Sequence, residues 1–165
     1  MKIAICDDEQ EDLALIHDLL MKYDSGKNHY ISDFSNADDF LAACRKENFD
    51  IALLDIEMKG TNGYDAAKLL SLEDNHPLMI FVTNNTAYSL KGYGVVFRYL
   101  TKPITLCLLS EVMDIAIREV LANSFLVLKN KLCKRNNRQI FVNTEIAAKQ
   151  GNAEERPDAG YGIKR

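Results

Sequence analysis

The sequence contains few cysteines, and they are not arranged as a metal site or a redox pair. The four residues are Cys6, Cys44, Cys107 and Cys133, and none belongs to a C-x-x-C pair. Cys6 and Cys107 stand among apolar residues, where we expect reduced, packed thiols. This pattern excludes a small secreted domain held together by disulfides and indicates a reducing compartment.

Long apolar runs are also missing. A typical run, LMIFV at 78–82, is far too short to span a bilayer. The N-terminal segment MKIAICDDEQ lacks a signal-peptide pattern, because acidic residues follow its apolar run at once. Internal repeats and low-complexity runs are absent. We therefore expect a cytoplasmic protein with no membrane partner.

The composition is that of a globular chain with an unequal distribution of charge. The 165 residues are 47% hydrophobic and 27% charged, enough for one domain with a core and an appendage. Residues 1–123 carry 11 Lys and Arg against 20 Asp and Glu, whereas residues 124–165 carry 9 against 4. We expect two regions with different roles, a domain at 1–122 and a basic extension at 123–165.

Apolar runs typical of strands alternate with segments of helical periodicity. Leu13, Ile16, Leu19 and Leu20 are spaced as on one face of a helix. Strands are predicted at 2–6, 29–35, 49–56, 77–84 and 97–103, and helices at 9–23, 36–47, 62–74, 85–94 and 104–123. This alternation predicts an α/β fold, a doubly wound five-stranded parallel sheet with five helices.

Polar residues follow the predicted strands at their carboxyl ends. In an open parallel sheet, ligands bind outside these ends, so the residues there should converge. They are Asp7, Asp8 and Glu9 after the first strand, Asp55 and Glu57 after the third, Thr83 and Asn84 after the fourth, and Lys102 and Pro103 at the fifth.

The chemistry of this set suits a divalent cation and a phosphoryl group. Carboxylates that lie close together repel one another unless a cation intervenes. Mg²⁺ takes one or two carboxylates, keeps waters and leaves room for a phosphate oxygen. Lys102 and the hydroxyl of Thr83 are suited to hold other phosphoryl oxygens. Asp55 is then the candidate nucleophile, forming an aspartyl phosphate.

Four motifs in this order resemble the receiver domain of two-component response regulators over residues 1–122. They are CDDE, LLDIEMKGTNGYDAA, FVTN and RYLTKPI, and the resemblance is strongest to receivers that precede LytTR-type DNA-binding domains. The resemblance implies a flavodoxin-like fold and a phosphoryl group transferred to Asp55 by a sensor histidine kinase. It also implies a Mg²⁺ site in which Asp8, Asp55 and the main-chain carbonyl of Glu57 bind the ion directly and Asp7 binds it mainly through water.

The same resemblance assigns a conformational switch. Lys102 would contact the phosphoryl group, Thr83 and Tyr99 would move together, and the Lys102–Pro103 bond would be cis. The output surface, and a homodimer if one forms, would use the segment 85–94, the fifth strand and the last helix. Two features depart from the family pattern: Lys59 replaces a usual proline, and the segment between Thr83 and Tyr99 is short.

Simpler interpretations stand beside these assignments. Asp7 and Asp8 are also suitable helix caps, and Thr83 is also an ordinary strand-end hydroxyl. Tyr99 is also a candidate core residue, and Glu57 a solvated loop acid. The three histidines, His17, His29 and His76, are scattered and are interpreted as surface or packing residues.

The basic extension is harder to interpret. Residues 124–146 resemble the first strands of a LytTR-type domain, and residues 147–165 have the composition of a disordered segment. A basic cluster in this extension is a candidate nucleic-acid contact, although a solubilising hairpin is the favoured alternative. It comprises Lys129, Lys131, Lys134, Arg135 and Arg138. DNA is expected as a partner only with a complete output domain.

The sequence thus predicts a Mg²⁺-dependent phosphoacceptor that controls an output, expected to be transcription, rather than a turnover enzyme. One alternative is a receiver-like binding module that never takes phosphate. Another is a phosphohydrolase of the haloacid dehalogenase type, but those enzymes carry a D-x-D nucleophile motif on the first strand. Here the candidate is D-x-E after the third strand, at Asp55.

Overall fold

The computed structural model describes residues 1–24, 26, 28–84 and 96–151, with side chains placed as far as residue 129. The chain divides into two compact units, Met1–Ala122 and Asn123–Arg165. Among the described residues, no helix is both long enough and apolar enough to cross a membrane.

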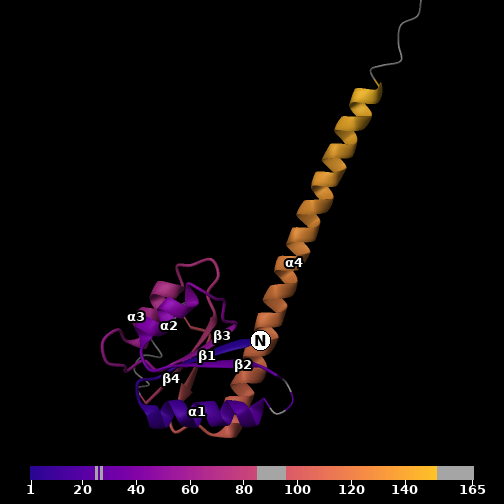
Figure 1. The fold of residues 1–165 in the computed structure, drawn as a ribbon. Coiled ribbons are helices and arrows are strands. Elements are labelled where there is room, and N and C mark those ends of the chain that lie inside the picture. The colour runs from indigo at the N-terminus through magenta and orange to yellow at the C-terminus, as the bar shows by residue number, and fades with distance from the viewer. Residues whose placement is uncertain (25, 27, 85–95, 152–165) are drawn as a thin grey trace, which may run out of the picture. The chain divides into compact units, whose positions relative to one another are not determined.

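The first unit is built on a five-stranded parallel sheet (Figure 1). Its strands are β1 (Lys2–Cys6), β2 (Tyr30–Phe34), β3 (Ile51–Leu54), β4 (Leu78–Thr83) and β5 (Arg98–Thr101). Their order is β2-β1-β3-β4-β5, the flavodoxin-like order, and every neighbouring pair is parallel. The three inner strands are almost completely buried, as strands covered on both faces must be.

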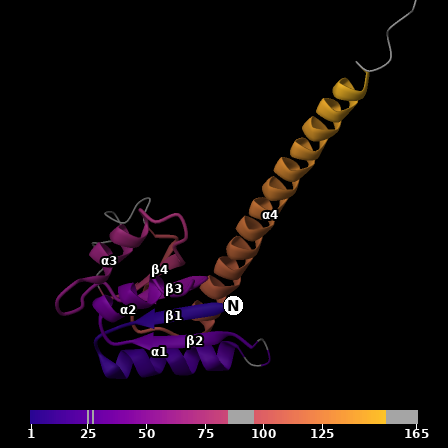
Figure 2. The same ribbon diagram turned by 45° about the horizontal axis from the view of Figure 1, so that its top comes forward.

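Helices cover both faces of this sheet. The helix α1 (Gln10–Tyr23) and the first turns of α4 (Leu106–Gly151) pack on one face, where Leu13, Ile16, Leu109 and Met113 join the core. The helices α2 (Ala37–Cys44) and α3 (Gly63–Leu70) pack on the other face. Figures 1 and 2 show α1 on the side of the sheet opposite α2 and α3.

Two asparagines fix the starts of the helices on the second face. Asn36 Oδ1 accepts a hydrogen bond from Asp39 N at the start of α2, and Asn62 Oδ1 accepts one from Asp65 N at the start of α3. Each bond satisfies a backbone N–H that the helix itself leaves without a partner. The cap at Asn62 matters for the site, because it determines where α3 begins relative to the end of β3.

The predicted α/β class, parallel sheet and strand set are confirmed. The segment 85–94, predicted as a fourth helix, lies outside the described residues, so the described part of the chain contains four helices where the sequence predicts five. The prediction of a packed thiol at Cys107 is wrong, because this cysteine is exposed. It lies two residues before the buried Leu109, which places it on the opposite side of α4.

The second unit corrects the prediction for the extension. Residues 124–146 are predicted to begin as strands, but α4 runs on as one helix to Gly151. It also includes residues 147–151 of the segment predicted to be disordered. A helix satisfies its backbone hydrogen bonds within its own segment, whereas strands need a second segment to pair with. Lys129 is exposed; the side chains of the other four basic residues lie outside those described.

Candidate functional site

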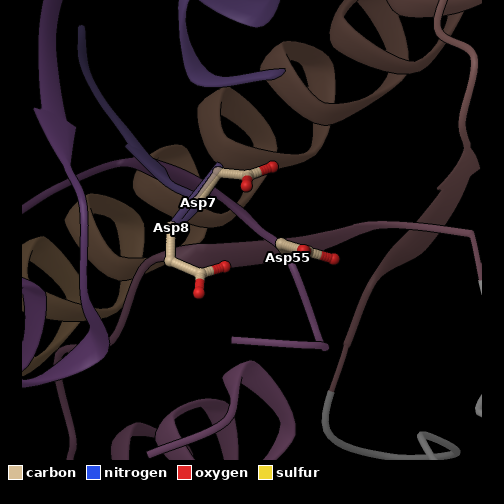
Figure 3. Close-up of side chains that lie close together, drawn as sticks. All are labelled: Asp7, Asp8 and Asp55. Carbon is tan, nitrogen blue, oxygen red and sulfur yellow. The ribbon is translucent and has the colours of Figure 1, made fainter. Parts of the chain in front are cut away.

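Three carboxylates meet at the carboxyl ends of β1 and β3. Oxygen atoms of Asp7, Asp8 and Asp55 all lie within 4.8 Å of one another (Figure 3). Backbone hydrogen bonds continue the sheet just past the strands: Asp7 N donates to Phe34 O, and Asp55 N donates to Cys6 O. These bonds fix the positions of the two aspartates. The predicted convergence of these acids is therefore observed.

The loop after β3 is held close to the start of α3. Gly63 N donates a hydrogen bond to Ile56 O over 3.1 Å. A Cβ atom on Gly63 would overlap the backbone oxygen of Asp55, so any other residue requires the backbone there to shift. This close approach places the start of α3 directly behind the candidate nucleophile.

Lys102 joins the site from the end of β5. Its Nζ lies 2.8 Å from Asp7 Oδ2, 2.6 Å from Asp12 Oδ2 and 3.4 Å from Asp55 Oδ2. The backbone N–H of Lys102 donates to the carbonyl of Thr83, which ties β5 to the end of β4. The ammonium thus serves as the positive centre of an acidic cluster.

Burial and charge shift the ionisation of these groups. Burial raises the pKa of Asp55; the charge of Lys102 opposes the rise and that of Asp7 adds to it. Burial by itself lowers the pKa of Lys102, but hydrogen bonds to Asp12 and Asp7 and the charge of Asp55 outweigh it, so that the pKa is raised. Lys102 is therefore a fixed positive charge at neutral pH.

The carboxylate of Asp8 has one partner and one open oxygen. Lys59 N donates to Asp8 Oδ2 over 3.1 Å. A proline at this position has no N–H, so replacing the usual family residue adds a donor to the site. Within the part of the chain that the structure describes, the buried Oδ1 of Asp8 has no hydrogen-bond partner. A buried, unpartnered carboxylate oxygen beside two other carboxylates fits a hard, oxygen-seeking cation such as Mg²⁺.

The predicted switch residues occupy neighbouring strands. Thr83 is the last residue of β4 and is buried, while Tyr99 lies on β5 opposite Phe81. The Tyr99 and Phe81 rings meet edge to face with centroids 5.5 Å apart. Tyr99 therefore packs against the core beside the end of β4, a position that suits both a core residue and a switch residue.

Other predicted residues play smaller parts in this geometry. The Lys102–Pro103 peptide bond is cis, as predicted. Glu57 is exposed, and its backbone N–H bonds to Asp55. Asp7 Oδ1 accepts a hydrogen bond from the N–H of Glu9, the residue before α1. The N-cap of α1 is Glu9 and no side chain caps it, so neither Asp7 nor Asp8 is the helix cap of the simpler interpretation.

Three contributions to the site are not predicted by the sequence patterns. Asp12 stands out there only as an acid that suits a helix start, yet it makes the shortest contact of Lys102. The sequence patterns single out neither Gly63 nor the backbone N–H of Lys59. The Asn-Gly pair before a helical segment is the one local signal that points to a close approach at Gly63.

Comparison with known proteins agrees with this geometry. Residues 3–114 match the family model described as "Response regulator receiver domain". The chain belongs to this family. Residues 3–114 form the receiver domain of a two-component response regulator, a class of domain that sensor kinases phosphorylate and that generally binds Mg²⁺.

Two curated relatives of this receiver domain are longer proteins. The chain is 30% identical over 107 residues to "Sensory transduction protein LytT" of Bacillus subtilis, a match that covers 62% of this chain and 42% of LytT. It is 25% identical over 152 residues to an "Uncharacterized response regulatory protein" of Yersinia pestis, covering 88% of this chain and 63% of that protein. The match thus spans less than two thirds of each relative.

Solved structures share the receiver fold. The response regulatory domain of protein mrkE from Klebsiella pneumoniae superimposes with a TM-score of 0.66 at 19% identity, covering 74% of this chain and 99% of that domain. The response regulator TrrA from Thermotoga maritima, solved in complex with Mg²⁺ and beryllofluoride, gives a TM-score of 0.58 at 24% identity, covering 70% and 97%. These likenesses support the fold.

Proposed function

We propose that this receiver domain accepts a phosphoryl group on Asp55 from a phosphohistidine of a sensor kinase and thereby controls an output. The observation that carries the proposal is the convergence of Asp7, Asp8, Asp55 and Lys102 at one edge of the sheet. This set provides a nucleophile, a cation site and a fixed positive charge, which are the parts that phosphoryl transfer needs.

In the transfer, an oxygen of Asp55 attacks phosphorus and the bond from phosphorus to the histidine nitrogen breaks. The electron pair of that bond leaves with the imidazole. Lys102 neutralises part of the charge on the phosphoryl oxygens, and the Thr83 hydroxyl is the second candidate donor. Mg²⁺ held by Asp7, Asp8, Asp55 and the Glu57 carbonyl would offset the clustered negative charge.

The consequence of the transfer is a shift between two conformations. The added charge on Asp55 favours a state in which Thr83 approaches the phosphoryl oxygens and Tyr99 turns inward. The output, which we propose is transcriptional, would be read from the face that includes β5 and the first part of α4, and a homodimer would use the same face. The relatives' names support this output, since one of them is "Transcriptional regulatory protein ResD" of Bacillus subtilis.

We propose that the chain takes and loses its own phosphoryl group and does not turn over free substrates. Asp55 follows β3, the third strand, whereas haloacid dehalogenase-type phosphohydrolases place their nucleophile after the first. Hydrolysis of a phosphate ester with many turnovers would favour that alternative.

The test is intact-mass spectrometry after incubation with acetyl phosphate and Mg²⁺. Wild type should gain one phosphoryl group, and Asp55→Asn should gain none. Asp18→Asn is the matched control, because Asp18 is an exposed aspartate on α1 and should leave phosphoryl uptake unchanged. Equal uptake by wild type and Asp55→Asn would refute the assignment of Asp55. No uptake by wild type, from acetyl phosphate or a kinase, would favour the phosphate-independent binding module.

A further inference from the structure

Lys102 has a third partner that the proposed chemistry does not use. Asp12 lies in the first turn of α1, and its Oδ2 is 2.6 Å from Lys102 Nζ. The corresponding distance is 2.8 Å to Asp7 and 3.4 Å to Asp55. Before any phosphoryl group arrives, the ammonium is thus held most closely by a carboxylate that lies outside the cluster at the strand ends.

Two of the three N–H groups of the ammonium donate hydrogen bonds, to Asp7 and to Asp12. The carboxylate of Asp55 lies farther away, as an ion pair of 3.4 Å. A phosphoryl group on Asp55 adds oxygens that need a donor from Lys102. Asp12 is the partner most readily replaced, because its side chain is 36% exposed whereas that of Asp7 is 0% exposed. Water can satisfy Asp12 after it leaves the ammonium.

The structure also leaves Asp12 room to move. A cavity of about 230 Å³ lies beside the pair, lined by Asp12 and Lys102 together with Asn84 and Pro103. Its remaining walls are the side chains of Leu15, Ile16 and Ile104. The Asp12 side chain therefore borders open space as well as the ammonium.

We propose that Asp12 is a positioning residue that acts through Lys102, holding the ammonium in the unphosphorylated protein and releasing it to the phosphoryl oxygens. This inference rests on the proposed function. Asp12 opposes the phosphorylated state in two ways. It occupies a donor of Lys102, and it places a negative charge beside a group that gains negative charge.

The first experiment measures the affinity for beryllofluoride, a non-covalent stand-in for the phosphoryl group, with the full chain and saturating Mg²⁺. Asp12→Asn should bind beryllofluoride about fivefold more tightly than wild type, the effect expected of losing one partly exposed ion pair. Glu11→Gln is the matched control. It removes the same charge from the same turn of α1, but Glu11 is exposed and makes no described contact with Lys102, so its affinity should stay within about twofold of wild type.

The second experiment follows Lys102 Nζ by ¹H–¹⁵N NMR, with the signal assigned by its loss in Lys102→Met. Without beryllofluoride, wild type and Asp12→Asn should differ in Nζ chemical shift and in proton exchange, because only wild type holds the ammonium with Asp12. With beryllofluoride bound, the two shifts should converge, because Asp12 has then left Lys102. A structural role of Asp12 in α1 would not produce this convergence.

Several results overturn the inference. They are an Asp12→Asn affinity no tighter than wild type, an equal gain in Glu11→Gln, or Nζ shifts that stay apart when beryllofluoride is bound. These results would leave the proposed function in place if wild type still binds beryllofluoride. If wild type and Asp12→Asn take up neither beryllofluoride nor phosphate, the proposed function itself fails and the inference with it.

Discussion

Replacing Gly63 with alanine tests how closely α3 approaches the site. The new Cβ would overlap Asp55 O and would lie 2.8 Å from Asp55 C and 3.2 Å from Ile56 Cα. All three atoms belong to the backbone, so no side-chain rotation can relieve the contact. Overpacking of this kind costs about 1–3 kcal/mol or more, and the better helix propensity of alanine offsets up to about 1 kcal/mol of it.

We therefore expect Gly63→Ala to lower the free energy of unfolding by about 2 kcal/mol, measured by urea denaturation followed by circular dichroism. The affinity for Mg²⁺, measured by calorimetry, should fall as well, because the backbone that must shift carries Asp55. The Gly63→Ala protein should therefore show both a lower free energy of unfolding and a weaker affinity for Mg²⁺.

Gly26→Ala is the control for the stability effect alone. Gly26 has a φ of +88°, and no atom lies within 4 Å of the position that a Cβ would take, so alanine is strained there but meets no neighbour. It should lose about 1 kcal/mol of stability and keep the wild-type affinity for Mg²⁺. A Gly63→Ala protein within about 0.5 kcal/mol of wild type, with unchanged Mg²⁺ affinity, would refute the reasoning.

Two further predictions concern ionisation. Burial raises the pKa of Asp55 above its ordinary value of 3.8. The folded protein therefore binds the proton of the Asp55 carboxyl group more tightly than the unfolded chain does. The free energy of unfolding consequently falls as pH rises from 3.8 through the raised pKa. In metal-free buffer, the free energy of unfolding of Asp55→Asn minus that of wild type should therefore increase as pH rises across that interval, as measured by urea titrations. A difference that stays constant with pH would contradict the raised pKa of Asp55. Burial, with the charges of Asp7, Asp55 and Asp8, also raises the pKa of Cys6 to about 12. Iodoacetamide at pH 8 should therefore modify the exposed Cys107 and leave Cys6 unmodified in the folded protein, as read by peptide mass spectrometry, whereas modification of Cys6 at the rate of Cys107 would show that it is accessible.

The sequence determined the sheet and most of the site, because both depend on local patterns. The apolar runs of the inner strands and the helical spacing of Leu13, Ile16 and Leu20 identify elements without knowledge of their partners. In a parallel sheet, residues that follow strands lie at one edge. The meeting of Asp7, Asp8 and Asp55 follows from that rule, and so does the position of Lys102.

Tertiary structure decided the contacts that join segments distant in the chain. Asp12 and Lys102 are 90 positions apart, and their pairing depends on how α1 lies over the end of β5. The same is true of the Lys59 N–H that reaches Asp8 and of the space that Gly63 leaves for Asp55. No local pattern records these distances.

In the extension, too, the local sequence pattern and the folded structure differ. Residues 124–146 contain Phe, Val and Ile in a pattern that favours strands, yet they lie within α4. Strand propensity is expressed only when another segment supplies the hydrogen bonds of a sheet, whereas a helix makes those bonds within itself. The sequence by itself indicated which residues are candidates for the chemistry, and the folded chain determined which of them touch, because contact depends on packing between segments that are far apart in the sequence.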